Sequence, residues 1–419
     1  MSRAARYQLL LLLALPLAAC RDSTGPGAGP VFEPAFRCVN GVADGFACDG
    51  VDLLGQVPLL DLEPGNSNSA LANDIWGWTD ETTGNDYVLV GRQDGVSIVD
   101  VTDPLSPRPI GRLPGATGAS TWRDIKVYRD HAYVVADGAG DHGVQVFDLR
   151  RLRGVAEFTV FTEDVRYDGV SSVHNIVINE ATGYAYAVGS NSGGETCGGG
   201  LHMIDIRTPA SPMFAGCFAS AGTGRAGTGY THDAQCVVYD GPDEAHVGRE
   251  ICIGSNETAI VIADVTDKGA PAGLSTASYP DAAYVHQGWL TPDHRYFLQD
   301  DELDELADSA AGMTRLLVWD VSDLDDPVLA QEYFGPTPAV DHNLYVRGDL
   351  AYYSNYTYGI RIVDVSSPAQ PAERGHFDTH PASDAPGFSG SWSNYPFFDN
   401  GVIAVSSSHD GLFLLQLQP

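Results

Sequence analysis

The 419-residue sequence predicts an all-β fold, a seven-bladed β-propeller in which an N-terminal strand closes the last blade. Two recurring patterns support this prediction: an apolar strand that ends in Asp, and a polar pair upstream of each such strand. The 47 Gly and 25 Pro suit many short strands joined by tight turns. Because a propeller arranges its blades around one axis, we expect a single domain at residues 37–419.

The apolar strand is clearest in GIRIVD (359–364), which leads into a Ser-Ser-Pro turn and a second short strand. Further copies follow a spacing of about fifty residues and begin at Gly95, Gly143, Gly200, Ala259, Arg315 and Gly411. The Asp recurs as Asp100, Asp148, Asp205, Asp264, Asp320 and Asp364. Positions spread around a ring cannot share one ligand, so we expect each carboxylate to stabilise a turn by accepting a backbone N–H two residues on.

The polar pairs are separated by 50 to 58 residues, and each opens an apolar run that we predict as the innermost strand of a blade. They are Asn73-Asp74, Arg123-Asp124, His174-Asn175, His232-Asp233, His286-Gln287, His342-Asn343 and Ser393-Asn394. Three more runs complete four antiparallel strands per unit, except that the seventh unit ends before its fourth strand. Residues 51–59 resemble the fourth strands elsewhere, and we predict that they close the last blade and leave no open edge there.

The chain carries a net charge of −32, from 55 acidic and 23 basic residues. So negative a field repels phosphate backbones and anionic lipid headgroups. Nucleic-acid binding is therefore excluded, and we interpret the charge as a source of solubility. No long amphipathic helical pattern occurs, and residues 301–311 are predicted to be an acidic loop.

The N-terminus predicts export. Residues 1–19 combine a basic start with an apolar run too short to span a bilayer, and are interpreted as a lipoprotein signal peptide. Cys20 follows Leu-Ala-Ala, which resembles a bacterial lipobox, and would carry the lipid. Residues 20–36 are then a flexible tether. We expect a membrane-anchored lipoprotein at the outer membrane, cell surface or periplasmic face, which touches the membrane only through its lipid.

Export would make the other six cysteines candidates for disulfides. Their spacing favours three local pairings: Cys38 with Cys48, Cys197 with Cys217, and Cys236 with Cys252. A zinc site is the alternative, but no C-x-x-C pair is present to support it.

Two rings of polar residues are predicted at one mouth of the central channel, where the innermost strands begin and the loops between second and third strands lie. The inner ring contains Asp74, Asp124, Asn175, Gln287, Asn343 and Asn394. Four consecutive units also supply a histidine there: His174, His232, His286 and His342. The alternative role for each histidine is a hydrogen bond to the neighbouring blade, as Asn73 and Arg123 would make at the same position.

Neutral imidazole binds transition metals, and nearby carboxylates orient such ligands or join them. We therefore predict a candidate site for a divalent metal (Ca, Zn, Mn or Fe) that combines the four histidines with Asp233, Asp300, Asp301 and Glu302. A calcium site within residues 300–304 is a further alternative, although EF-hand spacing is absent.

The repeat resembles the LVIVD repeat, and residues 37–419 as a whole resemble the choice-of-anchor B family of exported bacterial proteins. The segments that carry the resemblance are CVNG (38–41), CDGVDLL (48–54), HN (174–175), CGGGLH (197–202), THDAQC (231–236), GREIC (248–252), DDE (300–302) and DHNL (341–344). The resemblance implies a surface location, with a lipid-bearing cysteine as the anchor here. It implies no settled activity, so no catalytic residue is carried over.

The sequence contains neither a G-x-S-x-G elbow nor a phosphate-binding P-loop. We therefore predict a monomeric binding or interaction module with a protein or glycan ligand. Most of the Trp and Tyr near the strand starts are expected to fill the wedges between blades, and those left exposed would stack against the ligand. The alternative is a metal-dependent enzyme of hydrolase, lyase or oxygenase type that works at the histidine-ringed mouth.

Overall fold

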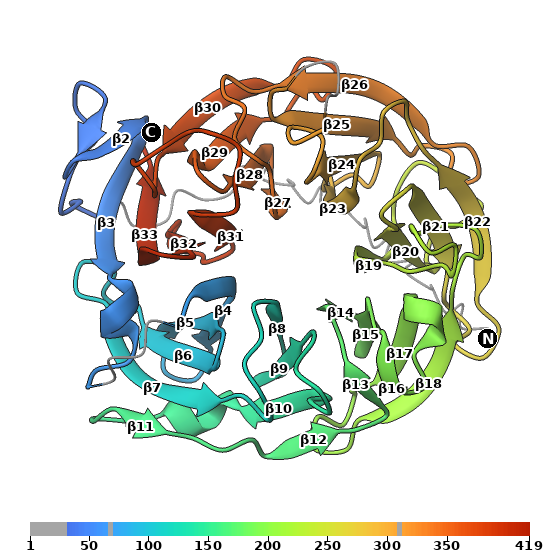
Figure 1. The fold of residues 1–419 in the computed structure, drawn as a ribbon, viewed down its shortest axis with the longest axis horizontal. Coiled ribbons are helices and arrows are strands. Elements are labelled where there is room, and N and C mark those ends of the chain that lie inside the picture. The colour runs from blue at the N-terminus through green and yellow to red at the C-terminus, as the bar shows by residue number, and fades with distance from the viewer. Residues whose placement is uncertain (1–31, 66–69, 308–311) are drawn as a thin grey trace, which may run out of the picture.

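The computed structural model describes residues 32–65, 70–307 and 312–419. Seven sheets of four or more strands stand around a central channel as the blades of a propeller (Figure 1). The all-β, seven-bladed fold predicted from the sequence is confirmed. The predicted signal peptide at residues 1–19, Cys20 and the first part of the tether lie outside the described residues.

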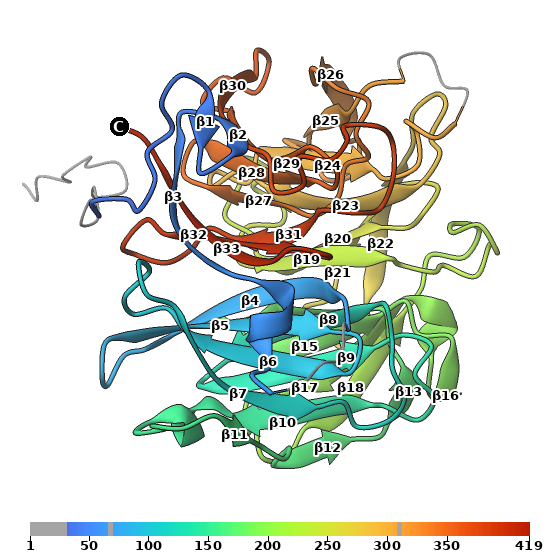
Figure 2. The ribbon, with the colours of Figure 1, turned by 60° about the vertical axis from the view of Figure 1, so that its left-hand side comes forward.

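Each blade runs from an inner strand beside the channel to an outer strand, and the blades follow one another along the chain (Figures 1 and 2). Blade 1 contains β4 (Ala72–Asp80), β5 (Asn85–Arg92), β6 (Gly95–Asp100) and β7 (Arg108–Pro114). Blade 2 contains β8 (Arg123–Tyr128), β9 (His131–Ala136), β10 (Val144–Asp148) and β12 (Val165–Tyr167). Blade 3 contains β14 (Asn175–Asn179), β15 (Tyr184–Val188), β17 (Leu201–Asp205) and β18 (Met213–Phe218). Blade 4 contains β19 (Asp233–Val238), β20 (Glu250–Ser255), β21 (Ile260–Asp264) and β22 (Ala272–Ala277).

The remaining blades repeat this order. Blade 5 contains β23 (Val285–Leu290), β24 (Tyr296–Asp301), β25 (Arg315–Asp320) and β26 (Val328–Phe334). Blade 6 contains β27 (Leu344–Arg347), β28 (Leu350–Asn355), β29 (Gly359–Asp364) and β30 (Ala372–Phe377). Blade 7 contains β31 (Ser391–Tyr395), β32 (Ile403–Ser407), β33 (Gly411–Leu417) and β3 (Val51–Val57). Short additions are β1 (Val42–Ala43), β2 (Phe46–Asp49), β11 (Thr159–Val160), β13 (Val170–Ser172), β16 (Ser192–Gly194) and the 3₁₀ turns η1 (Leu59–Leu62), η2 (Leu149–Leu152) and η3 (Cys197–Gly199).

The third strand of each blade is buried almost throughout, as in β25 and β29. It has a strand on each side and a neighbouring blade against each face, which is why its sequence is a nearly continuous apolar run. In six blades the pairing of the third with the fourth strand shifts by one residue near its middle. Such a bulge increases the local twist of the sheet.

The Asp at the end of the third strand stabilises the following turn, as the sequence predicts. In six blades its carboxylate accepts the backbone N–H two residues on, at 2.9 to 3.1 Å, from Thr102, Arg150, Arg207, Thr266, Ser322 and Ser366. This recurrent Asp is therefore a structural feature of the repeat.

The N-terminal strand closes the ring. β3 pairs antiparallel with β33, from Val51 opposite Leu417 to Val57 opposite Leu412, and supplies the fourth strand that blade 7 lacks. The β1–β2 hairpin adds to the outer edge of blade 6, where Cys48 lies opposite Phe377. The first described segment thus ties blades 6 and 7 together, and the prediction of a closing strand is confirmed.

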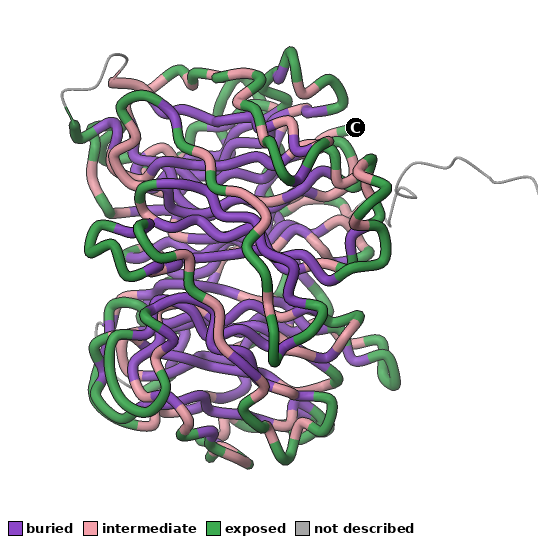
Figure 3. The backbone as a smooth tube through the Cα atoms, turned by 90° about the vertical axis from the view of Figure 1, so that its right-hand side faces the viewer, coloured by how far each residue is buried: buried purple, intermediate pink, exposed green. Residues whose placement is uncertain are grey.

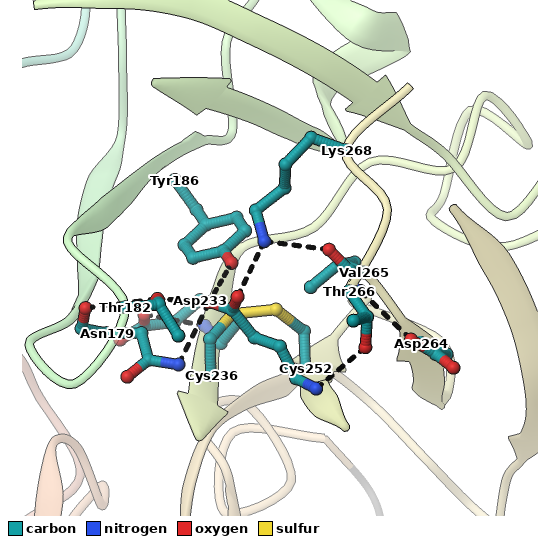
Figure 4. Close-up of a disulfide and its surroundings, with 12 residues drawn as sticks. Asn179, Thr182, Tyr186, Asp233, Cys236, Cys252, Asp264, Val265, Thr266 and Lys268 are labelled. Carbon is teal, nitrogen blue, oxygen red and sulfur yellow. Dashed lines mark hydrogen bonds and ion pairs between the residues drawn. A yellow bond between two sulfur atoms is a disulfide. The ribbon is translucent and has the colours of Figure 1, made fainter. Parts of the chain in front are cut away.

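Three disulfides join the pairs favoured by spacing: Cys38–Cys48, Cys197–Cys217 and Cys236–Cys252. Cys236 and Cys252 lie directly opposite each other on the inner and second strands of blade 4 (Figure 4). The three pairings predicted from the sequence are confirmed.

Buried residues follow the strands and exposed residues follow the connecting loops (Figure 3). Apolar clusters fill the wedges between blades, as between blades 1 and 2, where Trp78 and Ile98 share a cluster with Val134 and Phe147. Among the helices of the described residues, none combines the length and the apolar character that crossing a membrane would require. The packed wedges hold the inner strands in place, and with them the residues at the channel mouth.

Candidate functional site

His174, His232, His286 and His342 lie at or just before the starts of four successive inner strands, and together they form an arc around the channel mouth. The centroids of successive imidazole rings are 4.3, 4.3 and 4.4 Å apart along this histidine arc. A void of about 10 Å³ touches all four side chains. That is room for about one water molecule or one ion.

Each imidazole of the arc has its Nδ1 atom engaged by an oxygen. His286 Nδ1 is 2.8 Å from an oxygen of Asp300, and His232 Nδ1 is 3.0 Å from the carbonyl oxygen of His286. His342 Nδ1 bonds the carbonyl oxygen of Trp392. A carbonyl oxygen can only accept, so Nδ1 carries the hydrogen and the lone pair of a neutral ring lies on Nε2. Metal-binding histidines are oriented in this way.

Three side chains of the mouth approach one another closely enough to share a metal ion. One ligand atom each of His286, His342 and Glu302 lies within 4.8 Å of the others. Oε2 of Glu302 is 3.9 Å from His286 Nε2, and Oε1 of Glu302 is 3.7 Å from His342 Nε2. Two ligands about 2 Å from one metal are separated by up to about 4 Å, so these distances suit a shared ion.

The group is also held by its neighbours. The hydroxyl of Tyr356 donates to Glu302 at 3.0 Å, and Asp300 orients His286 from the far side of the ring. His286 is 1% exposed, yet its Nε2 atom has no hydrogen-bond partner in the described part of the chain. A buried polar nitrogen without a partner is unfavourable, and a bound cation would satisfy it.

The charge states of His232, His286 and His342 differ. Burial and the adjacent imidazoles lower the pKa of His232 and His342 well below 6.5, so both rings are neutral. Burial also opposes a charge on His286, but Asp300 and Glu302 outweigh it and raise the pKa of His286 to about 9. A metal would have to displace this proton, so its affinity should increase as the pH approaches 9.

Not all of the predicted metal ligands join the group of His286, Glu302 and His342. His174 stacks at one end of the arc, where its Nδ1 is 3.0 Å from Asp137. Asp301 accepts from the hydroxyl of Tyr279 at 2.6 Å and from the backbone N–H groups of Ala283 and Tyr284, and so holds the chain that precedes β23. Asp233 faces the opposite end of the channel.

The predicted inner polar ring serves mainly to join the blades. Asp124 accepts the N–H of Ile176, Asn175 donates to the carbonyl of His232, and Gln287 bonds both backbone groups of Leu344. The rest of the ring follows the same pattern: Asn394 donates to the carbonyl of Asn343, and Asn343 donates to Ser393 and to Asp74. The side chains thus stabilise the ring. The imidazoles above them bond through Nδ1, and the Nε2 atoms of His286 and His342 both face Glu302.

A larger cavity of about 530 Å³ lies at the end of the channel opposite the histidine arc. Its walls include five aromatic rings, from Trp76, Trp289, Tyr345, Tyr395 and Phe397. Trp76 and Trp289 lie three residues after Asn73 and His286. Three residues along an extended strand span about 10 Å, so these two Trp rings lie at the far end of the channel from the mouth.

Lys126 lies between these two spaces and is not among the site residues predicted from the sequence. Lys126 is buried between Asp124 and Asp74, at 2.6 and 3.3 Å, with its ammonium 4.6 Å from the ring of Trp76. It separates the mouth from the aromatic cavity. Lys126 is one of only two lysines in the chain. This rarity, three residues after Arg123, is the sequence signal that could have pointed to it, but the pattern of polar pairs does not include this position.

The comparisons with known proteins agree with this architecture. Residues 342–379 match the family model of the LVIVD repeat. The match spans blade 6 and supports a β-propeller repeat family. No curated protein matches the chain.

Among solved structures, the crystal structure of a protein from Lactobacillus plantarum is similar, with a TM-score of 0.52 and 13% sequence identity. The alignment covers 80% of this chain and 89% of that one. At this identity the likeness concerns the fold alone.

Proposed function

We propose that the protein is an exported, lipid-anchored binding protein that holds a divalent transition metal at the channel mouth. The propeller fold and its LVIVD repeat support a binding or interaction module in general. The observation that carries the metal is the approach of His286, His342 and Glu302 to within 4.8 Å. Two imidazoles and a carboxylate suit zinc, iron or manganese. The basic and apolar pattern of residues 1–19 and the lipobox-like Cys20 support export and anchoring.

Elemental analysis of untagged protein from Asp22 onward tests the proposal. We expect about one transition metal per chain, and a loss of at least about tenfold when His286 and His342 are both changed to Ala. The matched control is His131→Ala, because His131 lies at the start of β9, at the other end of the blades from the mouth. A well-folded protein without metal, or equal metal in the double variant, would exclude the site.

A metal held by three protein ligands keeps coordination positions for water or substrate, which is the arrangement of catalytic rather than structural sites. A metal-dependent hydrolase, lyase or oxygenase is therefore the catalytic form of this proposal. Its test is activity in a substrate screen that appears on loading with zinc, manganese or iron and disappears in the double histidine variant.

The aromatic cavity supports a second candidate function, the binding of a glycan or a peptide side chain at the opposite end of the channel. Rings of Trp289, Tyr345 and Phe397 pack edge to face around it, and Asp233 adds a carboxylate with one oxygen that makes no hydrogen bond in the described chain. Glycan-array binding that Trp289→Ala abolishes and the double histidine variant retains would establish this site.

A further inference from the structure

Three buried carboxylates gather beneath the channel mouth, outside the group of His286, Glu302 and His342. Asp304 and Glu305 belong to the turn that follows β24, and Asp341 lies just before β27 of the next blade. One oxygen of each lies within 4.8 Å of the others. The three residues are only 3%, 7% and 0% exposed.

Within the described chain, two members of this cluster, Glu305 and Asp341, have oxygens without the hydrogen-bond donors that buried carboxylates require. Both oxygens of Glu305 and Oδ1 of Asp341 are buried without a hydrogen-bond donor in the described residues. Asp304 is paired with Arg315 at 2.7 Å, and Asp341 Oδ2 accepts from Tyr353 at 2.6 Å. Arg315 thus pairs with one of the three carboxylates and also with Glu332 outside the cluster. Adjacent like charges in a low-dielectric interior cannot all remain ionised without another cation.

We propose that Asp304, Glu305 and Asp341 bind one hard divalent cation, calcium in preference to others, at the base of the β24–β25 loop. Calcium takes six to eight oxygen ligands at about 2.3 to 2.6 Å, so two oxygens on one ion are up to about 5 Å apart. The carboxylate oxygens meet this limit. Magnesium fits less well, because it keeps most of its water and is rarely enclosed by a protein cage. The absence of histidine and thiolate ligands from the group disfavours zinc and copper.

The calcium site differs from the one considered within residues 300–304. Asp300 bonds His286 and Asp301 accepts from Tyr279, so neither is a ligand of the proposed cation. The third ligand, Asp341, comes from the next blade. The cation would link blade 5 to blade 6. It would also brace the mouth, because Glu302 lies on the same turn and His342 directly follows Asp341. Calcium binding itself does not depend on the transition-metal proposal.

Titration of the purified, chelator-treated protein with calcium chloride, by calorimetry and by thermal unfolding, tests the site. We expect about one calcium per chain and a higher unfolding temperature. Glu305→Gln and Asp341→Asn should each weaken calcium binding by on the order of 100-fold. Asp323→Asn and Asp325→Asn, in the exposed β25–β26 turn, are matched controls and should bind calcium normally.

A purely structural role predicts a different result. Hydrogen-bonded structural carboxylates would lose stability on amidation, with or without calcium. We expect the calcium-free variants to be as stable as the wild type or more so, since amidation relieves repulsion, and only the wild type to gain from calcium. The site would be ruled out by an absence of calcium stabilisation in the wild type, or by unchanged calcium affinity in both variants. His286→Ala should keep calcium binding, which separates this outcome from failure of the transition-metal proposal.

Discussion

At the scale of single residues, burial decides which histidines can carry a charge. His142 is fully buried, and its Nε2 lies 2.8 Å from Nη1 of Arg123 while Nδ1 donates to the carbonyl oxygen of Gly143 at 2.9 Å. Nε2 must therefore accept, which requires a neutral ring. Burial lowers the pKa of His142, and the positive charge of Arg123 lowers it further, to about 4. The ordinary value of 6.5 applies in the unfolded chain.

Between pH 6.5 and pH 4 the unfolded chain therefore binds a proton at His142 that the folded protein does not. The free energy of unfolding should fall as the pH is lowered through this window, by up to about 3 kcal/mol from this residue. His142→Gln cannot titrate, so urea unfolding between pH 4 and 8 should show a smaller decrease for the variant than for the wild type. Identical decreases would mean that His142 is protonated in the folded state.

At the scale of elements, blades are joined by buried polar groups as well as by apolar wedges. Glu250, the first residue of β20, accepts from Tyr186, Thr182 and Asn179 of blade 3 at 2.5 to 2.9 Å. The other oxygen of Glu250 pairs with the ammonium of Lys268 at 2.6 Å. Figure 4 shows Lys268 together with Asn179, Thr182 and Tyr186 of blade 3. One carboxylate thus ties the second strand of blade 4 to two strands of blade 3 and the turn between them.

Removing one member of this pair leaves the other buried without its counter-charge. Glu250→Gln or Lys268→Met alone should lower the free energy of unfolding by about 3–5 kcal/mol, and the double variant by much less than the sum of the two. The exposed pair of Glu33 and Arg37 is the control, where single changes should cost about 1 kcal/mol or less. Urea unfolding of the four single variants and the two double variants measures both coupling energies, and additive effects at Glu250 and Lys268 would contradict the buried pair.

The repeating elements are predictable from the sequence because their patterns are local. Strands such as β6 and β29 begin and end where the apolar run and its Asp indicate. Side-chain direction at the mouth is not local, because the pairing of inner strands shifts beside the polar pairs, as between Val285 and Gly288. The sequence can therefore place His286 at the mouth but cannot show where its ring points.

The cluster of Asp304, Glu305 and Asp341 shows a second limit of prediction from sequence, namely contacts between residues of different blades. Glu305 and Asp341 come from different blades, and the packing of blade 5 against blade 6 brings them together. In the sequence, Glu305 is part of an acidic loop and Asp341 precedes the polar pair His342-Asn343. Neither position by itself indicates a metal ligand. The burial that makes the cluster unusual is a property of the assembled blades.

At the scale of the whole molecule, stability depends on closing the ring. β3 buries Val51, Leu53, Leu54 and Val57 against blade 7. At about 2 kcal/mol for each buried side chain, these contacts contribute about 8 kcal/mol, comparable with the total stability of a typical domain. A chain that begins at Leu59 would lose them and expose the edge of β33, so we expect it to form oligomers or aggregate.

A circular permutation can distinguish two ways in which β3 stabilises the ring. One is its pairing with β33, and the other is its covalent connection to blade 1. Gln418 donates to the carbonyl oxygen of Cys38 at 3.3 Å, so a short glycine linker can join Pro419 to Phe36. A permuted chain that runs from Leu59 to Pro419, then through the linker to residues 36–58, keeps every contact of the closing strand. We expect it to be monomeric by light scattering and to unfold within a few degrees of the wild type, while the truncated chain associates. If the truncated chain is itself a stable monomer, pairing of β3 with β33 is not what closes the propeller. If the permuted chain fails to fold, the connection through residues 58–71 contributes more to the stability of the ring than β3 does.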